Sequence, residues 1–158
     1  MIRDYTLECI VKMIHAHLQF LHYQMKWITH VPTLFEYYAA LHLTKQLQTP
    51  FYVYCDLPNR HKISAGFPIQ DKGIDIIDST FQHIVQVKYY KKHGEIHYGT
   101  LSTFLATPIL VGRMNLKLTL VRTNHSLLHS EIKNIIKRGD LHDVTLCPQQ
   151  FLRSIKKL

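Results

Sequence analysis

The chain has 158 residues, 46% of them hydrophobic and 19% charged, and a formal net charge of +8. This length suits one domain with a single hydrophobic core, and the composition is that of a folded protein rather than a disordered one. The positive surplus favours a polyanionic partner, nucleic acid before a membrane surface, although the charge of a basic protein also serves solubility alone. Clusters of lysine and arginine at 91–92, 137–138 and 153–157 are candidate phosphate contacts.

Cysteine spacing and the longest apolar runs restrict the setting of the protein. Cys9, Cys55 and Cys147 lie far apart and form no C-x-x-C pair. This argues against a disulfide framework or a zinc knuckle and favours a reducing environment. Charges near the start interrupt any signal-peptide core, and no apolar run reaches the length of a membrane span. We therefore expect a soluble, intracellular protein without a membrane partner.

Two helices are predicted before the first strand. Apolar residues recur at steps of three and four over residues 5–28, which predicts a long amino-terminal helix. Val31-Pro32 interrupts this pattern. Thr33 and Glu36 then have the spacing of a capping box, so we expect a second helix over 33–48 that stops before a proline.

The rest of the chain alternates between predicted strands and helices. Runs of β-branched and aromatic residues predict strands at 51–55, 74–78, 83–90, 116–121 and 144–147. Helical periodicity predicts helices at 98–106, from 124 or 126 to 138, and from 148 to 155, whereas turn formers make 56–68 a loop. This order predicts an α/β fold with a mixed sheet flanked by helices. We expect one domain over 1–158, in which 1–30 form a helical extension and 31–158 the core.

Two neighbouring predicted strands carry side chains suited to binding a metal ion. Asp75 is flanked by Ile74 and Ile76 and is expected to point away from them, and an unpaired buried charge there would be costly. On the next strand Gln86 and Lys88 are two residues apart and therefore emerge on one face. A simple ion pair between Asp75 and Lys88 is the structural alternative to a metal site.

Hydrolysis of a phosphodiester needs a cation that polarises the phosphate and lowers the pKa of the attacking water. Magnesium prefers oxygen ligands, so Asp75 is the expected carboxylate ligand, the Gln86 side-chain oxygen a neutral one, and the Val87 carbonyl a further one. Lys88 is expected to position the water or to stabilise the developing charge. The hypothesis is an endonuclease that uses Mg²⁺, with Mn²⁺ as a substitute.

The sequence Asp75 … Gln86-Val87-Lys88 resembles the PD-(D/E)XK nuclease superfamily in its Gln-x-Lys variant, in particular the Mrr-like restriction endonuclease branch. The resemblance covers roughly 33–146 and implies a restriction-endonuclease-like core with DNA as substrate. It also implies a helix and then a strand after Lys88, and a further acid from the first conserved helix, where Glu36 stands. Similar domains occur at the amino ends of large viral helicase-like proteins. The resemblance therefore adds a helicase domain or subunit as a partner, and the cytoplasm or nucleus of a host cell as the location; a homodimer stays open.

Two features depart from the family pattern. Asp75 follows Gly73-Ile74 instead of a proline, and Gln86 replaces the second acid, which removes a negative charge from the expected metal site. Glu36 as a ligand would compensate for this loss, although a capping-box role explains it equally well. The alternative function is a nuclease-fold module with weak or no catalysis that binds DNA or a helicase partner.

Other candidate residues have simpler structural interpretations. Asp71 and Asp78 would replace the predicted acid if the strand register were shifted. Glu95 is interpreted as an acid of a surface loop. His125 and His129 are four residues apart, but no glutamate lies between them as in a zinc-binding H-E-x-x-H motif, so a solvated helix face is favoured.

Overall fold

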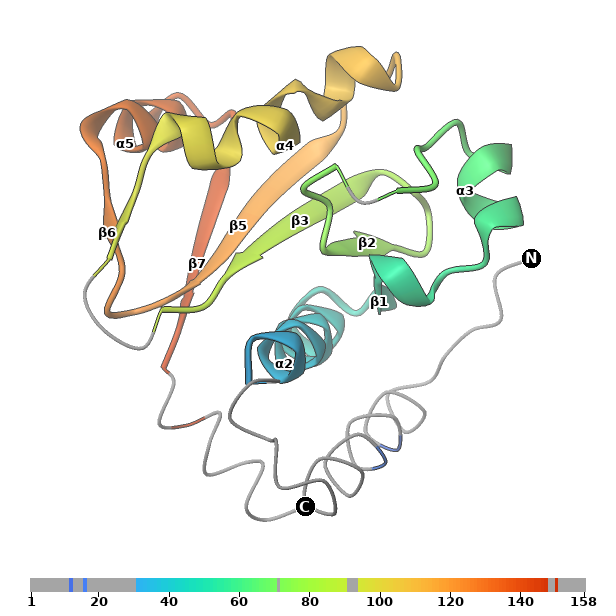
Figure 1. Cartoon of the computed structure of the whole chain (residues 1–158), viewed down its shortest axis with the longest axis horizontal. Helices are drawn as coiled ribbons and strands as arrows, with labels where there is room; N and C mark the ends of the chain where they lie inside the picture. The colour runs from blue at the N-terminus through green and yellow to red at the C-terminus, as the bar shows by residue number, and fades with distance from the viewer. Residues whose placement is uncertain are drawn as a thin grey trace.

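Five strands form a mixed sheet in the order β1-β2-β3-β5-β7, with helices against both of its faces (Figure 1). The computed structural model describes Lys12, Ala16, residues 31–70, 72–90 and 94–147, and Gln150. Within these residues no helix is long and apolar enough to cross a membrane. The arrangement confirms the predicted α/β class and the mixed sheet flanked by helices.

The first three strands of the sheet are antiparallel neighbours. They are β1 (Phe51–Val53), β2 (Ile76–Asp78) and β3 (His83–Lys88). A turn over residues 79–82 joins β2 to β3, so the two strands form a hairpin. The residues at the start of β2 therefore lie beside the end of β3.

The last two strands extend the sheet from β3 in parallel. They are β5 (Lys117–Thr123) and β7 (His142–Leu146). Parallel neighbours need a crossover connection, and a helix supplies each one. These helices are α4 (Tyr98–Leu110), between β3 and β5, and α5 (Ser130–Lys137), between β5 and β7.

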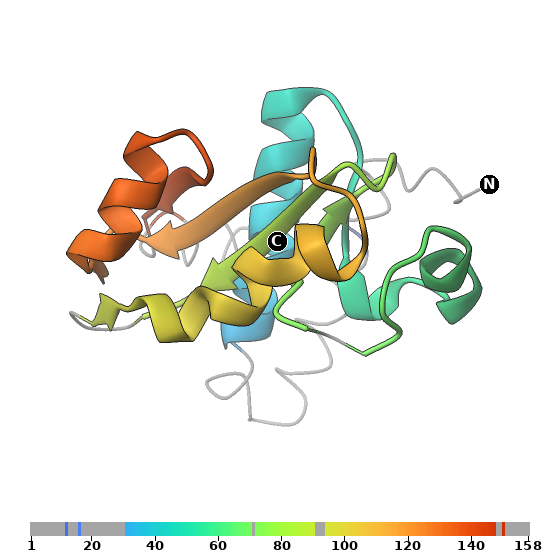
Figure 2. The same ribbon diagram turned by 90° about the horizontal axis from the view of Figure 1, so that it is seen from above.

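Each face of the sheet has its own apolar core. Helix α2 (Val31–Leu47) covers one face, against side chains that include Val53, Ile76, Val85 and Val87. Helices α4 and α5 cover the opposite face, against side chains that include Ile77, Ile84, Leu118 and Leu120. Seen from above, α4 runs over the sheet while α2 crosses beneath it (Figure 2). The alternation of Ile84, Val85 and Val87 between the two cores is that of a strand buried on both sides.

Short elements occupy two of the connections. A 3-10 helix, η2 (Tyr54–Asp56), follows β1, and α3 (Asn59–Ser64) lies inside the segment 56–68. The prediction of an irregular loop over 56–68 is therefore wrong in part. The strands β4 (Glu95–Ile96) and β6 (Leu127–Leu128) pair in parallel beside the main sheet.

Several predicted helix and strand boundaries move in the structure. Thr33 already lies inside α2, so it is not an N-cap and the capping-box interpretation of Glu36 is wrong. Helix α4 continues through Pro108 to Leu110, because a proline near the end of a helix removes only one of its last hydrogen bonds. The helices predicted over 5–28 and 148–155 lie outside the described residues, apart from Lys12, Ala16 and Gln150, which are helical.

Candidate functional site

Asp75 lies immediately before β2, beside the carboxyl end of β3. Its carboxylate Oδ2 accepts a hydrogen bond of 2.6 Å from the main-chain N–H of Val87. Its own N–H donates to the Val85 carbonyl at 2.9 Å, and its carbonyl accepts from the Tyr54 N–H at 2.8 Å. These bonds hold the acid between β3 and the end of β1, so main-chain contacts on both sides determine its position.

The side chain of Asp75 does not follow the alternation expected of a regular strand. Ile74 packs in the core under α4, whereas Ile76 packs in the core under α2, although the two are only two residues apart. The ladder with β3 begins only at Ile76, so the chain changes its conformation at Asp75. The strand predicted over 74–78 is therefore confirmed only for Ile76–Asp78, and the prediction that both isoleucines lie on the side opposite the acid is wrong.

Gln86 is buried at the centre of the site. Its side chain is 6% exposed and packs against Gly73, where an added Cβ would lie 3.3 Å from Gln86 Nε2. Among the described residues, Gln86 Oε1 is the only buried side-chain nitrogen or oxygen atom without a hydrogen-bond partner. Leaving an acceptor buried in this state costs about 1–3 kcal/mol, and a cation or its bound water would remove that cost. Asp75 and Gln86 supply a carboxylate and an amide oxygen, which are ligand types that magnesium prefers.

Lys88 ends β3 and is half-buried. No described residue forms a hydrogen bond or an ion pair with its ammonium group, so the ion pair with Asp75, the structural alternative to a metal site, is not formed within the described part of the chain. Its neighbour in register on β5 is Arg122, which makes two hydrogen bonds of 2.8 and 2.9 Å to Asp143. Arg122 is thus neutralised by Asp143, whereas Lys88 has no acidic ion-pair partner among the described residues.

Glu36 lies on α2, half-buried and close to the segment that follows β1. Partial burial, the charge of Asp56 and then that of Glu36 raise the pKa of Cys55 to about 11. Burial and a hydrogen bond to Asp56 also raise the pKa of Tyr37 above its ordinary value. The charge of Glu36 thus acts on Cys55, which follows Tyr54, the residue whose N–H is bonded to Asp75. Its role as a metal ligand stays a prediction.

Asp78 has a structural role at the opposite end of β2. Its carboxylate accepts hydrogen bonds from the Thr80 hydroxyl and, at 2.9 Å each, from the N–H groups of Gln82 and His83. These bonds hold the turn between β2 and β3. Asp78 is therefore not a substitute for Asp75, and Asp71, the other alternative, lies outside the described residues.

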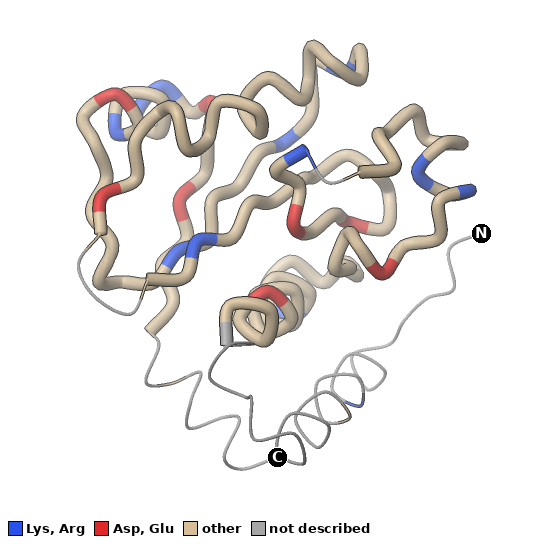
Figure 3. Tube along the Cα trace, viewed as in Figure 1, with Lys and Arg blue, Asp and Glu red and all other residues tan. Residues whose placement is uncertain are grey.

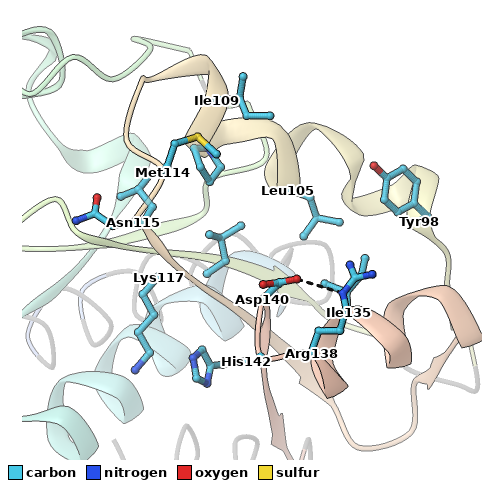
Figure 4. Close-up of a pocket in the computed structure, with 14 residues that line it drawn as sticks. Tyr98, Leu105, Ile109, Met114, Asn115, Lys117, Ile135, Arg138, Asp140 and His142 are labelled. Carbon is cyan, nitrogen blue, oxygen red and sulfur yellow. Dashed lines mark hydrogen bonds and ion pairs between the residues drawn. The ribbon is translucent and has the colours of Figure 1, made fainter.

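A cavity of about 450 Å³ lies between α4, α5 and the starts of β5 and β7 (Figure 4). Its walls are largely apolar, and the ion pair between Arg138 and Asp140, at 3.2 Å, stands at its side. Lys117 and His142, the first residues of the parallel strands β5 and β7, line this cavity. Lys88 is instead the last residue of β3. The cavity is thus at the other end of the sheet and contains none of the predicted site residues.

A second group of chemically useful side chains was missed by sequence reasoning. Glu95, His97 and His129 offer ligand atoms that all lie within 4.8 Å of one another. The prediction that Glu95 is in a loop is wrong, because it begins β4. The prediction of a shared helix face for His125 and His129 is also wrong, because α5 begins only at Ser130. No local signal marks this group, since His129 is 32 residues from His97 along the chain.

Basic side chains are spread over the described molecule. Lysine and arginine positions are distributed along the chain over α3, α5 and the strands, and acidic positions occur among those of α5 and the strands (Figure 3). Of the predicted phosphate contacts, Arg138 pairs with Asp140, and the clusters at 91–92 and 153–157 lie outside the described residues.

Comparison of the chain with protein-family models, with curated proteins and with solved structures gives no match. The function is therefore inferred from the geometry of the site itself.

Proposed function

We propose that the protein is a metal-dependent endonuclease that hydrolyses DNA phosphodiester bonds with Asp75, Gln86, Val87 and Lys88. One observation carries this proposal: the buried Gln86 Oε1 has no hydrogen-bond partner, two residues from a lysine that has no ion-pair partner among the described residues. The buried acceptor lacks a donor or a cation, and the half-buried ammonium is able to bind an anion. A divalent metal ion with a phosphate ester bound to it supplies both at once.

The order of elements supports a restriction-endonuclease-like core. Apart from the short elements η2, α3 and β4, the chain runs from α2 to β5 through a helix, three antiparallel strands, a helix and a parallel strand. This includes the helix and strand that the resemblance implies after Lys88. The proposed site also lies where β3, the central strand, ends between an antiparallel and a parallel neighbour.

Each residue of the proposed site has a separate task. A bound Mg²⁺ or Mn²⁺ would polarise the phosphate and lower the pKa of an attacking water. Asp75, oriented by the Val87 N–H, is the proposed carboxylate ligand of the metal. Gln86, held against Gly73, offers Oε1 as a neutral ligand, and the Val87 carbonyl is the further oxygen ligand in this proposal. Lys88 stabilises the negative charge that develops on the phosphate, and Glu36 is the proposed second acid.

The proposed substrate is inferred from the net positive charge of the chain. With a net charge of +8, contacts to phosphates would supply most of the affinity, and base reading would be weak. This favours cleavage with little dependence on sequence.

The test is the cleavage of supercoiled plasmid in Mg²⁺, in Mn²⁺ and in a chelator. The wild-type chain should nick the plasmid only with metal. Asp75→Asn and Lys88→Met should each slow nicking by at least about 10²-fold, the range seen when one electrostatic group is removed from an active site. Asp78→Asn is the matched control, because it removes the charge of an acid at the other end of β2, where the carboxylate only holds a turn. Nicking at the wild-type rate in either site variant would refute the proposal.

A nuclease-fold module without useful catalysis is the second candidate. It is favoured by Gln86, which stands where the family has an acid and so removes one carboxylate from the proposed site. Such a module would bind DNA with strong salt dependence, alone, as a homodimer or beside a helicase, and would show no Mn²⁺ binding that depends on Asp75 in calorimetry.

A further inference from the structure

Three potential metal ligands gather outside the proposed nuclease site. Glu95, His97 and His129 present ligand atoms within 4.8 Å of one another. His97 Nε2 lies 3.9 Å from Glu95 Oε2, and the rings of His97 and His129 have centroids 5.1 Å apart at an angle of 39°. All three side chains are at least partly exposed.

The short parallel ladder explains why these side chains meet. Ile96 of β4 is paired with Leu128 of β6, and the His129 N–H donates to the Ile96 carbonyl at 3.0 Å. His97 and His129 therefore leave the ladder side by side. Glu95 is two residues before His97 and so emerges on the same face of β4.

Both histidines stand at the N-cap, the residue immediately before a helix, where they do little capping. His97 is the N-cap of α4, and its side chain makes no capping hydrogen bond. His129 is the N-cap of α5, and its Nδ1 accepts only a long bond of 3.4 Å from the Glu131 N–H. Histidine is not among the residues that favour N-caps, so helix formation does not explain its presence at both positions.

We propose that Glu95, His97 and His129 bind a zinc ion. Two imidazoles and one carboxylate are a donor set that zinc takes, whereas magnesium prefers oxygen ligands alone. Zinc–nitrogen bonds of about 2.0–2.1 Å place tetrahedral ligand atoms about 3.4 Å apart, so the present separations close by rotation of exposed side chains. The Glu131 carboxylate, 3.8 Å from His129 Nδ1, or a water completes the coordination.

The zinc ion would act as a clamp between two crossover connections. β4 and β6 have two residues each, and so short a ladder has little stability of its own. Zinc would tie the starts of α4 and α5 together through His97 and His129. Helix α4 in turn packs Phe104 against Gly73, where an added Cβ would lie 3.3 Å from Phe104 Cβ. The clamp would therefore fix the helix that supports Gln86 in its pocket.

The test is a titration of the metal-free chain with Zn²⁺ in competition with a chromogenic chelator. One tight zinc site per chain is expected in the wild-type protein, and at least tenfold weaker binding in His97→Ala/His129→Ala. His142→Gln is the matched control, since His142 is an exposed histidine of another strand. Asp75→Asn should keep the tight site, which separates this metal from the proposed nuclease metal.

Thermal unfolding of the same variants, with and without zinc, tests the proposal even if the double variant folds less well than the wild-type chain. Zinc should raise the midpoint of the wild-type chain and leave that of the double variant unchanged, because a ligand stabilises only the state that binds it. Glu95→Gln, which keeps size and shape, should lower zinc affinity without lowering the midpoint of the metal-free chain. Equal zinc affinity in the wild-type chain and in both the double and the Glu95→Gln variants would overturn the proposal.

Discussion

The carboxylate of Asp75 accepts a hydrogen bond of 2.6 Å from the main-chain N–H of Val87, the residue between Gln86 and Lys88. The acid that precedes β2 is thereby attached to the strand that carries the other proposed site residues. An asparagine at position 75 still offers an oxygen to this N–H. Loss of activity in Asp75→Asn would therefore report the charge of the carboxylate rather than the geometry of the turn.

The first prediction concerns Gln86. Gln86→Leu should leave the free energy of unfolding within about 1 kcal/mol of wild type, because it removes an amide whose oxygen has no partner. The same substitution should weaken Mn²⁺ binding, since it removes a proposed ligand. Gln86→Glu should strengthen that binding, on the order of tenfold, because affinity rises with the charge of the ligands. Urea unfolding and calorimetry measure the two effects, and unchanged Mn²⁺ affinity in Gln86→Leu would remove Gln86 from the metal site.

Gly73 should tolerate no side chain. It has a φ of +85°, and a Cβ would meet Gln86 Nε2 and Phe104 Cβ at 3.3 Å each. Gly73→Ala should lower the free energy of unfolding by about 2–3 kcal/mol, from backbone strain and from the packing conflict.

Gly66 is the matched control for this substitution. Its φ is +80°, but an added Cβ has no atom within 4 Å, so Gly66→Ala should lose only about 1–2 kcal/mol of strain. The difference between the two variants in urea unfolding isolates the contacts with Gln86 and Phe104. Equal losses would mean that the close approach of Gly73 to Gln86 and Phe104 has no energetic weight.

Cys55 can report whether Glu36 binds metal. Partial burial, then the charges of Asp56 and Glu36, raise the pKa of Cys55 to about 11, although the thiol remains accessible at the surface. Glu36→Gln should therefore speed alkylation of Cys55 at pH 8 by about two- to fourfold, because the reactive thiolate becomes more abundant. Mg²⁺ should have the same effect on the wild-type chain if it binds Glu36, and none on Glu36→Gln.

Mass spectrometry after iodoacetamide treatment measures this reactivity residue by residue. Cys147, a free thiol elsewhere in the structure, is the internal control in each sample. If Mg²⁺ leaves the rate of Cys55 alkylation in the wild-type chain unchanged, Glu36 is excluded from the ligand set and Asp75 remains as the carboxylate ligand.

His83 should make stability depend on pH. Burial, then the charge of Lys117, lower the pKa of His83 to about 4. The unfolded histidine has a pKa of about 6.5 and so takes up its proton first as the pH falls. The stability that His83 contributes is thus complete above pH 6.5 and is lost as the pH falls through 4, by about 3 kcal/mol in total.

Urea unfolding at pH 7 and at pH 4.5 tests this dependence. The wild-type chain should lose more stability between these values than His83→Gln, which cannot titrate. His61→Gln, at a half-buried histidine of α3, should behave like wild type. Identical pH profiles for wild type and His83→Gln would contradict the assignment.

Local sequence patterns predicted most of the order of helices and strands, but not the residues at which these elements begin and end. The strand of Gln86 and Lys88 was expected over 83–90 and spans His83–Lys88, because a dense run of β-branched residues is a strong local signal. The start of α5 was expected near residues 124–126, yet Leu127–Leu128 pairs with β4 instead. A tertiary contact there overrides the helical periodicity of the segment.

The sequence by itself determined the α/β class, the alternation of strands and helices, and the direction of Gln86, because these depend on periodicities of two and 3.6 residues. Only the tertiary structure decided that Asp75 turns toward Val87, that Gln86 Oε1 is buried without a partner among the described residues, and that His97 meets His129. These three relationships depend on the pairing of distant segments. The register of such pairing is set by which side chains pack together in the two cores, and no local pattern contains that information.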